Sequence, residues 1–220
     1  MSDDPASGPG PSSKGGAETP RASRLESLWQ GAFGDDYTKR NADTAQARRP
    51  FWTELLGRRP CERVLEVGCN LGANLESIAT LVPPRGVFGL DVNEGALVEL
   101  RAHLPRVNAV WGLARELPFR DRYFDLVFTT GVLIHQPPDM MPVVMGEIVR
   151  CSRRYVLAGE YHSETLTEVP YRGQPGALYK RDFGALYREL HPELRLLDQG
   201  FLSVEKGWDD VTYWLFERPE

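Results

Sequence analysis

The sequence predicts an α/β fold: a mostly parallel sheet with helices on both faces and an antiparallel hairpin at its C-terminal end. Three observations lead to this prediction. Short apolar runs alternate with amphipathic segments between residues 63 and 159, these runs are nearly free of charge, and two strand-like runs follow one another at the end of the chain. Regular alternation is typical of parallel β-α-β units, and continuously apolar strands are those buried between two layers of helices.

The expected strands are short apolar runs between turn residues, and the expected helices are longer segments with one apolar face. We expect strands at residues 63–67, 86–90, 107–111, 125–129, 155–159, 194–204 and 211–217. We expect helices at residues 21–31, 50–56, 74–81, 94–102 and 142–151, and a shorter one that follows a turn at residues 33–37 and ends at residue 41. Another helix should begin within residues 180–183, and residues 205–210 should form the turn of the final hairpin.

The composition divides the chain into three parts. Residues 1–20 are rich in Gly, Pro and Ser and carry no large apolar side chain except Met1, so we expect a disordered tail. Residues 21–56 form the N-terminal helical segment. Residues 57–220 carry the α/β domain, whose length allows a core of ordinary size.

Charge and cysteine content exclude several classes of function. The net charge is −5 and the basic residues are scattered, which disfavours a nucleic-acid partner. The sequence has no apolar run long enough to cross a membrane and does not open with a secretory signal. The three cysteines form no CxxC pair and the four histidines have no metal-ligand spacing. We therefore expect a cytoplasmic protein with reduced thiols, no metal and a small-molecule substrate, either monomeric or homodimeric.

The sharpest local feature is a glycine-bearing loop between the first expected strand and the next helix. The loop contains Gly68, Asn70 and Gly72 and leads to Asn74, and Glu66 stands before it. A dinucleotide site would have a third glycine where Ala73 stands and would bind a pyrophosphate. A carboxylate suits a cationic ligand instead, such as S-adenosylmethionine (SAM), which carries an ammonium and a sulfonium. This pattern resembles the motif of class I SAM-dependent methyltransferases.

Two further strand ends extend this resemblance. Asp91 ends the second expected strand, where a carboxylate can accept both ribose hydroxyls, with Val92 beside it. The alternative is that Asp91 caps the helix that follows. After the third strand, Leu113 and Ala114 flank the adenine in the class I pattern. Many members of the class have an acidic residue where Leu113 stands, so we expect backbone groups to contact the adenine here.

Seven blocks in order resemble a narrower family, the methylases associated with pseudaminic acid biosynthesis. They are residues 29–41, 116–121, 131–135, 160–161, 169–173, 180–183 and 208–214. The resemblance implies the Rossmann-like class I methyltransferase fold with a seven-stranded sheet, and it implies that the helical segment 21–56 is a lid over the SAM-binding domain. It also implies that Tyr37 lines the methionine end of SAM, that Arg40 pairs with its carboxylate, and that Thr130 lies beside it.

The segment after the fourth strand is where a methyl acceptor should meet SAM. It lacks the N/D-P-P-Y/F motif, which disfavours methylation of DNA bases and glutamine. His135 in this segment is either a general base or a hydrogen-bonded structural histidine. Trp29 and Phe33 are either substrate-wall residues or anchors of the N-terminal helix.

Four other residues are candidates for binding the acceptor. Glu160 and Tyr161 follow the fifth strand, and Tyr171 and Arg172 lie in a polar loop that can roof a substrate. Glu160 would hold a cationic or hydroxylated group and Arg172 a carboxylate, unless Arg172 is a solvated surface charge.

These features predict a SAM-dependent methyltransferase that releases S-adenosylhomocysteine (SAH). The acceptor is expected to be a small polar metabolite, sugar-like or resembling a natural product or an amino acid. Two alternatives remain open: a partner subunit that binds SAM without catalysis, and a nucleotide-cofactor oxidoreductase on a similar fold.

Overall fold

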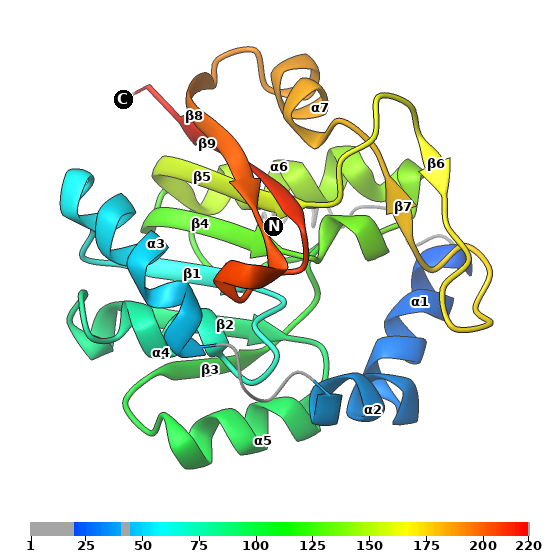
Figure 1. Ribbon diagram of the computed structural model, residues 1–220, viewed down its shortest axis with the longest axis horizontal. Coiled ribbons are helices and arrows are strands. Elements are labelled where there is room, and N and C mark those ends of the chain that lie inside the picture. The colour runs from blue at the N-terminus through cyan, green and yellow to red at the C-terminus, as the bar shows by residue number, and fades with distance from the viewer. Residues whose placement is uncertain (1–19, 41–44, 220) are drawn as a thin grey trace, which may run out of the picture.

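The computed structural model describes residues 20–40 and 45–219, and their centre is one sheet of seven strands in the order β3-β2-β1-β4-β5-β9-β8 (Figure 1). The first five strands are parallel, whereas β9 is antiparallel to both β5 and β8. The predicted fold class is confirmed. The strands are β1 (Val64–Val67), β2 (Val87–Asp91), β3 (Asn108–Trp111), β4 (Phe124–Thr130), β5 (Ser152–Glu160), β8 (Arg195–Leu202) and β9 (Val211–Glu217).

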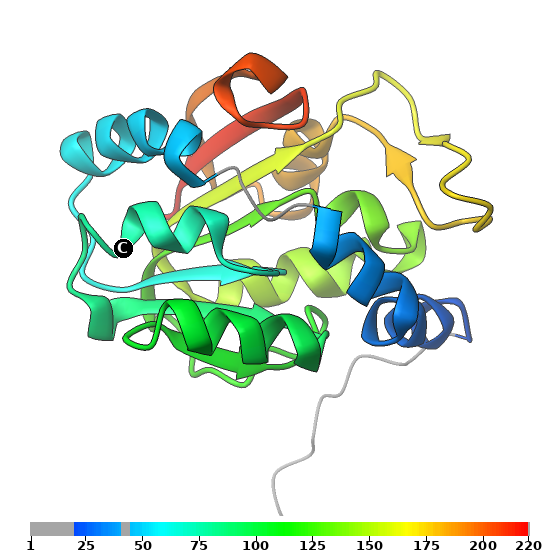
Figure 2. The same cartoon turned by 60° about the horizontal axis from the view of Figure 1, so that its bottom comes forward.

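Helices cover both faces of this sheet (Figures 1 and 2). One buried layer joins the sheet to α3, α4 and α5, and the other joins it to α6 and α7. Two more helices, α1 and α2, lie at the carboxyl edge of the parallel strands (Figure 2). The helices are α1 (Pro20–Gln30), α2 (Ala32–Arg40), α3 (Ala45–Arg58), α4 (Ala73–Ile78), α5 (Glu94–His103), α6 (Met141–Cys151) and α7 (Phe183–Leu190).

Two features of the N-terminal part differ from the sequence prediction. The turn expected at residues 33–37 is wrong, because these residues belong to α2. Their polar members, Asp35 and Asp36, are exposed, while Phe33 and Tyr37 are one helical turn apart and both contact Trp29. Helix α3 also begins before the expected residue 50, so that Pro50 lies inside it. The expected disordered tail and residue 41 lie outside the described residues.

A small antiparallel pair was not predicted. Strands β6 (Thr167–Glu168) and β7 (Tyr179–Lys180) are too short to give an alternating pattern. The expected helix start nearby is confirmed: Asp182 caps α7 by accepting a hydrogen bond from the Ala185 amide at 2.8 Å. Across the described residues, no helix is both long and apolar enough to span a bilayer.

Candidate functional site

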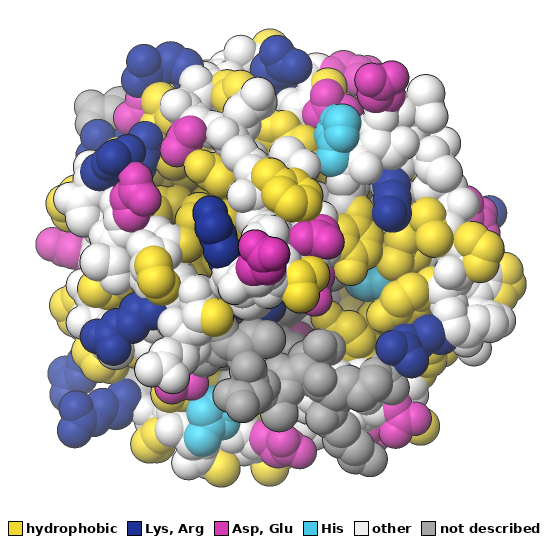
Figure 3. All heavy atoms as spheres, in the orientation of Figure 1, with side chains coloured by type: hydrophobic (Ala, Val, Ile, Leu, Met, Phe, Trp, Pro, Cys, Tyr) yellow, Lys and Arg dark blue, Asp and Glu magenta, His cyan; other side chains and the backbone are white. Residues whose placement is uncertain are grey.

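A deep pocket lies where the loops after β1, β2, β3 and β4 meet α1 and α2. This is the carboxyl edge of the parallel strands, where open α/β sheets bind ligands. Figure 3 shows hydrophobic side chains gathered between α1 and β7 on this side of the molecule. The pocket thus brings together the sequence motifs of the sheet and residues of the N-terminal helices.

Glu66 lies on the floor of the pocket. The residue is 2% exposed, and Oε1 accepts hydrogen bonds from Asn74 Nδ2 at 2.6 Å and from the Thr130 hydroxyl at 3.3 Å. Oε2 is buried and has no partner among the described residues. Burial raises the pKa of Glu66 to about 8, although the bonds from Asn74 and Thr130 oppose this rise. An unsatisfied carboxylate oxygen on a pocket wall calls for a cationic donor from a ligand.

The loop that follows β1 has a backbone that requires glycine. Gly68 has φ of 74°, and a Cβ there would lie 2.4 Å from Val132 Cγ2. The Gly68 amide donates to the Leu90 carbonyl at 2.7 Å, which joins this loop to β2. The predicted role of Gly68, a tight turn that lets backbone approach a ligand, agrees with its place on the pocket wall.

Asp91 lies at the other side of the same loop. Its Oδ2 accepts from the Asn70 amide at 2.7 Å and its Oδ1 from the Asn93 amide at 2.9 Å. Burial raises the pKa of Asp91, and these amides oppose that rise. The capping alternative for Asp91 is wrong, because Asn93 caps α5 by accepting from the Ala96 amide at 2.8 Å. Asp91 and Val92 both line the pocket. The Asp91 carboxylate therefore lies where hydroxyl donors of a ligand can reach it.

The pocket ends beyond β3, where Gly112, Leu113 and Ala114 line it. Behind them, Arg115 Nε lies 2.7 Å from Glu26 Oε1, which connects this segment to α1. Leu113 and Ala114 thus line the pocket, and contact of their backbone with adenine stays a prediction.

Arg48 is a pocket residue that the sequence prediction missed. It projects from α3, its side chain is 12% exposed, and its Nε donates to the Gly207 carbonyl at 2.8 Å. Its guanidinium stacks on Trp208 at 4.7 Å and Nη1 donates to Asn74 Oδ1 at 3.4 Å. A sequence signal existed: Arg48 is one helical turn before the buried Trp52, so both must face the sheet.

Five aromatic side chains, which we call the ring cluster, cover the acceptor side of the pocket. Trp29 lies 5.2 Å from Phe33, 5.4 Å from Tyr37 and 4.5 Å from His135, measured between ring centroids. Tyr171 closes the cluster at 5.2 Å from His135 and 6.0 Å from Phe33. Trp29, Tyr37 and His135 line the pocket, and burial raises the pKa of Tyr37.

Comparison with known proteins finds similarity to methyltransferases. Residues 64–154 match the family model described as methyltransferase domain. The chain is 33% identical, over 42% of its length, to a probable phthiotriol/phenolphthiotriol dimycocerosates methyltransferase of Mycobacterium ulcerans, and 31% identical, over 71% of its length, to 24-methylenesterol C-methyltransferase 2 of Oryza sativa. The matched parts span only 36% and 44% of those proteins. Residues 64–154 therefore resemble a methyltransferase domain.

Solved structures show the same fold. The 1,6-didemethyltoxoflavin-N1-methyltransferase of Burkholderia thailandensis, crystallised with its acceptor and SAH, has a TM-score of 0.72 at 18% identity and covers 93% of both chains. Magnesium protoporphyrin IX methyltransferase of Synechocystis has a TM-score of 0.66 with SAH and 0.65 with SAM, at 14% identity, covering 90% and 92% of this chain and 99% of that chain in both cases. The fold is the Rossmann-like class I methyltransferase fold.

Most of the residues predicted to bind the cofactor lie around one pocket. The pocket wall includes the following predicted residues: Tyr37, Glu66, Gly68, Asn70, Asn74, Asp91, Val92, Leu113, Ala114 and Thr130. Gly72 lies one step behind the wall and permits the start of α4 beside Leu100, which a Cβ would approach to 2.5 Å. The side chain of Arg40 lies outside the described residues, so its predicted pairing stays a prediction.

Several predicted acceptor residues have other roles in the structure. Glu160 is fully buried and accepts from the amides of Val132 at 3.0 Å and Ile134 at 3.3 Å, so it shapes the loop after β4 and does not face the pocket. Burial raises the pKa of Glu160 to about 7, while these amides oppose the rise. Phe33 and Tyr171 support Trp29 and His135 from behind.

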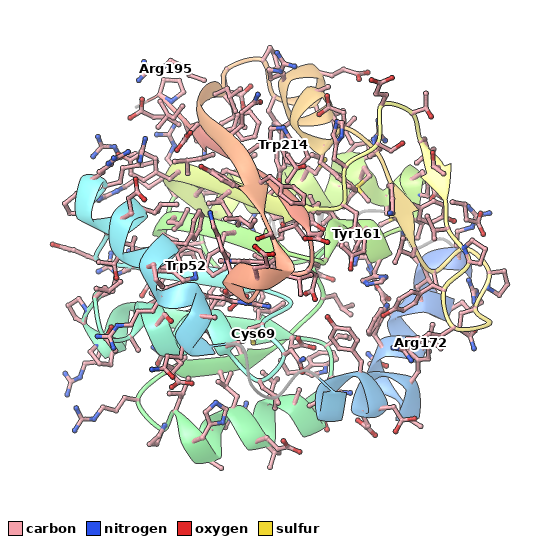
Figure 4. The ribbon with its side chains drawn as sticks, viewed as in Figure 1. Trp52, Cys69, Tyr161, Arg172, Arg195 and Trp214 are labelled. Carbon is pink, nitrogen blue, oxygen red and sulfur yellow. The ribbon has the colours of Figure 1, made fainter. Side chains whose placement is uncertain are left out.

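Tyr161 and Arg172 also lie off the pocket wall among the described residues (Figure 4). The Tyr161 ring lies 5.2 Å from Lys180 Nζ. Arg172 is exposed and lies 5.9 Å from the Tyr171 ring, which agrees with the surface-charge alternative.

Proposed function

We propose that the protein transfers a methyl group from SAM to a small molecule and releases SAH. The observation that carries this proposal is the free Oε2 of Glu66, a buried carboxylate oxygen without a partner on the wall of the pocket. This oxygen can accept a hydrogen bond from the ammonium group of a ligand. Asp91, at the other side of the Gly68 loop, can accept from ribose hydroxyls. A dinucleotide has no ammonium to offer Glu66.

The residues present fit SAM as follows. Glu66 would hold the ammonium, Arg48 the carboxylate, Asp91 the ribose hydroxyls, and the backbone of residues 112–114 the adenine. Arg48 is already oriented by the Gly207 carbonyl and the Trp208 ring, so binding a carboxylate needs little reordering. We propose that Arg48 pairs with the SAM carboxylate alongside Arg40. The same role for Arg40 is supported only by the family resemblance of the sequence.

Bound SAM supplies an activated methyl group, so the protein has to position the acceptor and keep water away. Helices α1 and α2 serve the second task, and we propose that they are the lid. Asn93 Nδ2 holds them by donating to the Trp29 carbonyl at 3.1 Å and to Asp35 Oδ1 at 2.9 Å. Asp91, which we propose for the ribose hydroxyls, and Asn93, which holds the lid, therefore lie in the same turn.

A small acceptor is supported by the names of the similar proteins. They include methyltransferases for 1,6-didemethyltoxoflavin, phosphoethanolamine and a methylenesterol. We also propose that the protein belongs to the methylases associated with pseudaminic acid biosynthesis. Its proposed location is the cytoplasm. The cysteines agree with a reducing compartment, because Cys61, Cys69 and Cys151 are all free.

Isothermal titration calorimetry of the full chain with SAM, SAH and NAD tests the proposal. We expect binding of SAM and SAH and none of NAD. Arg48→Met should weaken SAM binding roughly tenfold through loss of a charged hydrogen bond, whereas Arg58→Met, on the same helix but exposed and paired only with Glu54, should leave it unchanged. Binding of NAD without SAM or SAH would overturn the proposal.

A further inference from the structure

The tautomer of His135 is fixed by its surroundings. Its Nδ1 lies 2.6 Å from the carbonyl oxygen of Ala177, which can only accept, so Nδ1 carries the proton and donates. Burial lowers the pKa of His135 to about 4, and the imidazole is therefore neutral. No described residue bonds to Nε2, although His135 lines the pocket. The acceptor side of the pocket thus offers one fixed lone pair.

The neighbouring ring offers a donor. Trp29 Nε1 is buried and has no hydrogen-bond partner among the described residues, and the Trp29 and His135 rings are 4.5 Å apart. A buried N–H without a partner is costly unless a ligand satisfies it. One donor and one acceptor side by side suit a ligand edge on which N–H or O–H stands next to a carbonyl.

The remaining surface of the ring cluster carries no charged side chain. Tyr37 stands nearly perpendicular to Trp29, with an interplanar angle of 89°, and the cluster contains no Asp, Glu, Lys or Arg. The charged groups of the pocket either lie on the side proposed for the cofactor or form ion pairs. Glu26 pairs with Arg115, and Asp209 lies 3.9 Å from Arg48. The cluster offers no carboxylate to an ammonium and no cation to a phosphate, and a sugar has more hydroxyls than its one donor and one acceptor can pair.

We propose that the methyl acceptor is a planar aromatic or heteroaromatic molecule that stacks in the ring cluster and presents an N–H or O–H to His135 Nε2. The inference rests on the proposed function and names the substrate class of the same site. Aromatic side chains bind flat ring systems through large, rigid contact areas. The class comprises phenols, enols and ring N–H groups flanked by carbonyls.

The reaction balances with these groups alone. The acceptor atom uses its lone pair to form the bond to the methyl carbon, the carbon–sulfur bond breaks, and its electron pair stays on sulfur as SAH forms. The proton of the acceptor passes to His135 Nε2 and then to solvent. Because buried His135 is a weak base, the acceptor proton must itself be acidic, as it is in phenols and imides but not in sugar hydroxyls.

A pair of substitutions separates this role of His135 from a structural one. In His135→Asn the side-chain amide can still donate to the Ala177 carbonyl, but the lone pair of Nε2 is lost. In His135→Gln an oxygen replaces that lone pair, while the bond to Ala177 is lost. A purely structural histidine would tolerate Asn better than Gln, and an acceptor-binding histidine would show the reverse order for ligand binding.

The probe is lumazine, a fused planar dione with an acidic ring N–H, titrated into the SAH complex by calorimetry. Glucosamine and ethanolamine serve as sugar and alkylamine probes. We expect lumazine to bind more tightly than both, and His135→Asn to weaken it roughly tenfold with SAH affinity unchanged. The proposal is overturned if lumazine does not bind at millimolar concentration, if glucosamine or ethanolamine binds more tightly, or if His135→Asn binds lumazine like the wild type. SAH binding in the same titrations reports on the proposed function separately.

Discussion

Helices α1–α2 and helix α3 belong to one predicted N-terminal segment, yet they are attached to the domain in different ways. Helix α3 is anchored by Trp52, which is fully buried, lies 4.6 Å from the Phe128 ring and donates through Nε1 to Asn74 Oδ1 at 3.2 Å. Helices α1 and α2 bury only Ala22 and Leu25 among their described apolar side chains, and they are attached mainly by Asn93, the pair of Glu26 with Arg115 and the ring cluster.

This difference separates a fixed wall of the site from a movable one. Helix α3 shares the core of the sheet and holds Arg48 in place, so it behaves as part of the SAM-binding domain. Helices α1 and α2 bury few large side chains, and hydrogen bonds at their margin can break without loss of the core. The lid that we propose therefore comprises α1 and α2, a shorter segment than the predicted residues 21–56.

The largest expected effect follows from removing the anchor of α3. Trp52→Ala should lower the free energy of unfolding by about 3–5 kcal/mol, because it leaves a cavity beside Phe128 and removes one of two hydrogen bonds to Asn74 Oδ1. The matched variant Trp29→Ala removes the same side chain from the half-buried lid and should cost much less. Urea unfolding of both variants measures the loss of unfolding free energy relative to the wild type. Equal losses would contradict the distinction between wall and lid.

An intermediate effect is expected at the contact between lid and cofactor loop. Asn93→Asp keeps the oxygen that caps α5 but places a carboxylate against the Trp29 carbonyl and Asp35. SAM affinity should fall roughly tenfold, with the melting temperature little changed.

Its control is the double variant Asn93→Asp with Asp35→Asn. The new amide at position 35 can donate to the new carboxylate at position 93, so calorimetry should show SAM affinity largely restored. A single variant that binds SAM like the wild type would show that Asn93 does not hold the lid.

The smallest effect is expected for the ion pair between α1 and the segment after β3. Glu26→Gln removes one charge from a pair whose side chains are 20% and 14% exposed. Partly solvated pairs are worth less than about 1 kcal/mol, so SAM affinity should change by a small factor that shrinks further at high salt. A loss as large as that of Asn93→Asp would assign the main attachment of the lid to Glu26 instead.

The fold was predictable because buried parallel strands and amphipathic helices leave long-period patterns, and the cofactor loop because Glu66, Gly68 and Asp91 sit at strand ends. Helix α2 was misread because Gly34, Asp35 and Asp36 look like turn residues locally. Contacts with Trp29 outweigh that local preference. Glu160 was assigned to the acceptor from its position at a strand end, but only coordinates show that backbone amides use its carboxylate.

Arg48 and the fixed tautomer of His135 were out of reach for related reasons. The role of Arg48 depends on residues 207–209, which are distant in the chain. The tautomer of His135 depends on the Ala177 carbonyl, which lies in an irregular loop. The spacing from Trp52 indicates only that Arg48 faces the sheet, and neither contact with a distant carbonyl leaves a local pattern.

The central claim, that Glu66 receives the ammonium of SAM, predicts a proton balance. In the free protein the pKa of Glu66 is raised to about 8, so the carboxyl is mostly protonated at neutral pH. An ammonium beside Oε2 lowers that pKa, and the carboxyl ionises. Calorimetric titration of SAM in buffers of different ionisation enthalpy should show release of about one proton per SAM near pH 7, decreasing as the pH rises past 8. Glu66→Gln should abolish this release and weaken binding. Equal proton release by the wild type and Glu66→Gln would contradict the account.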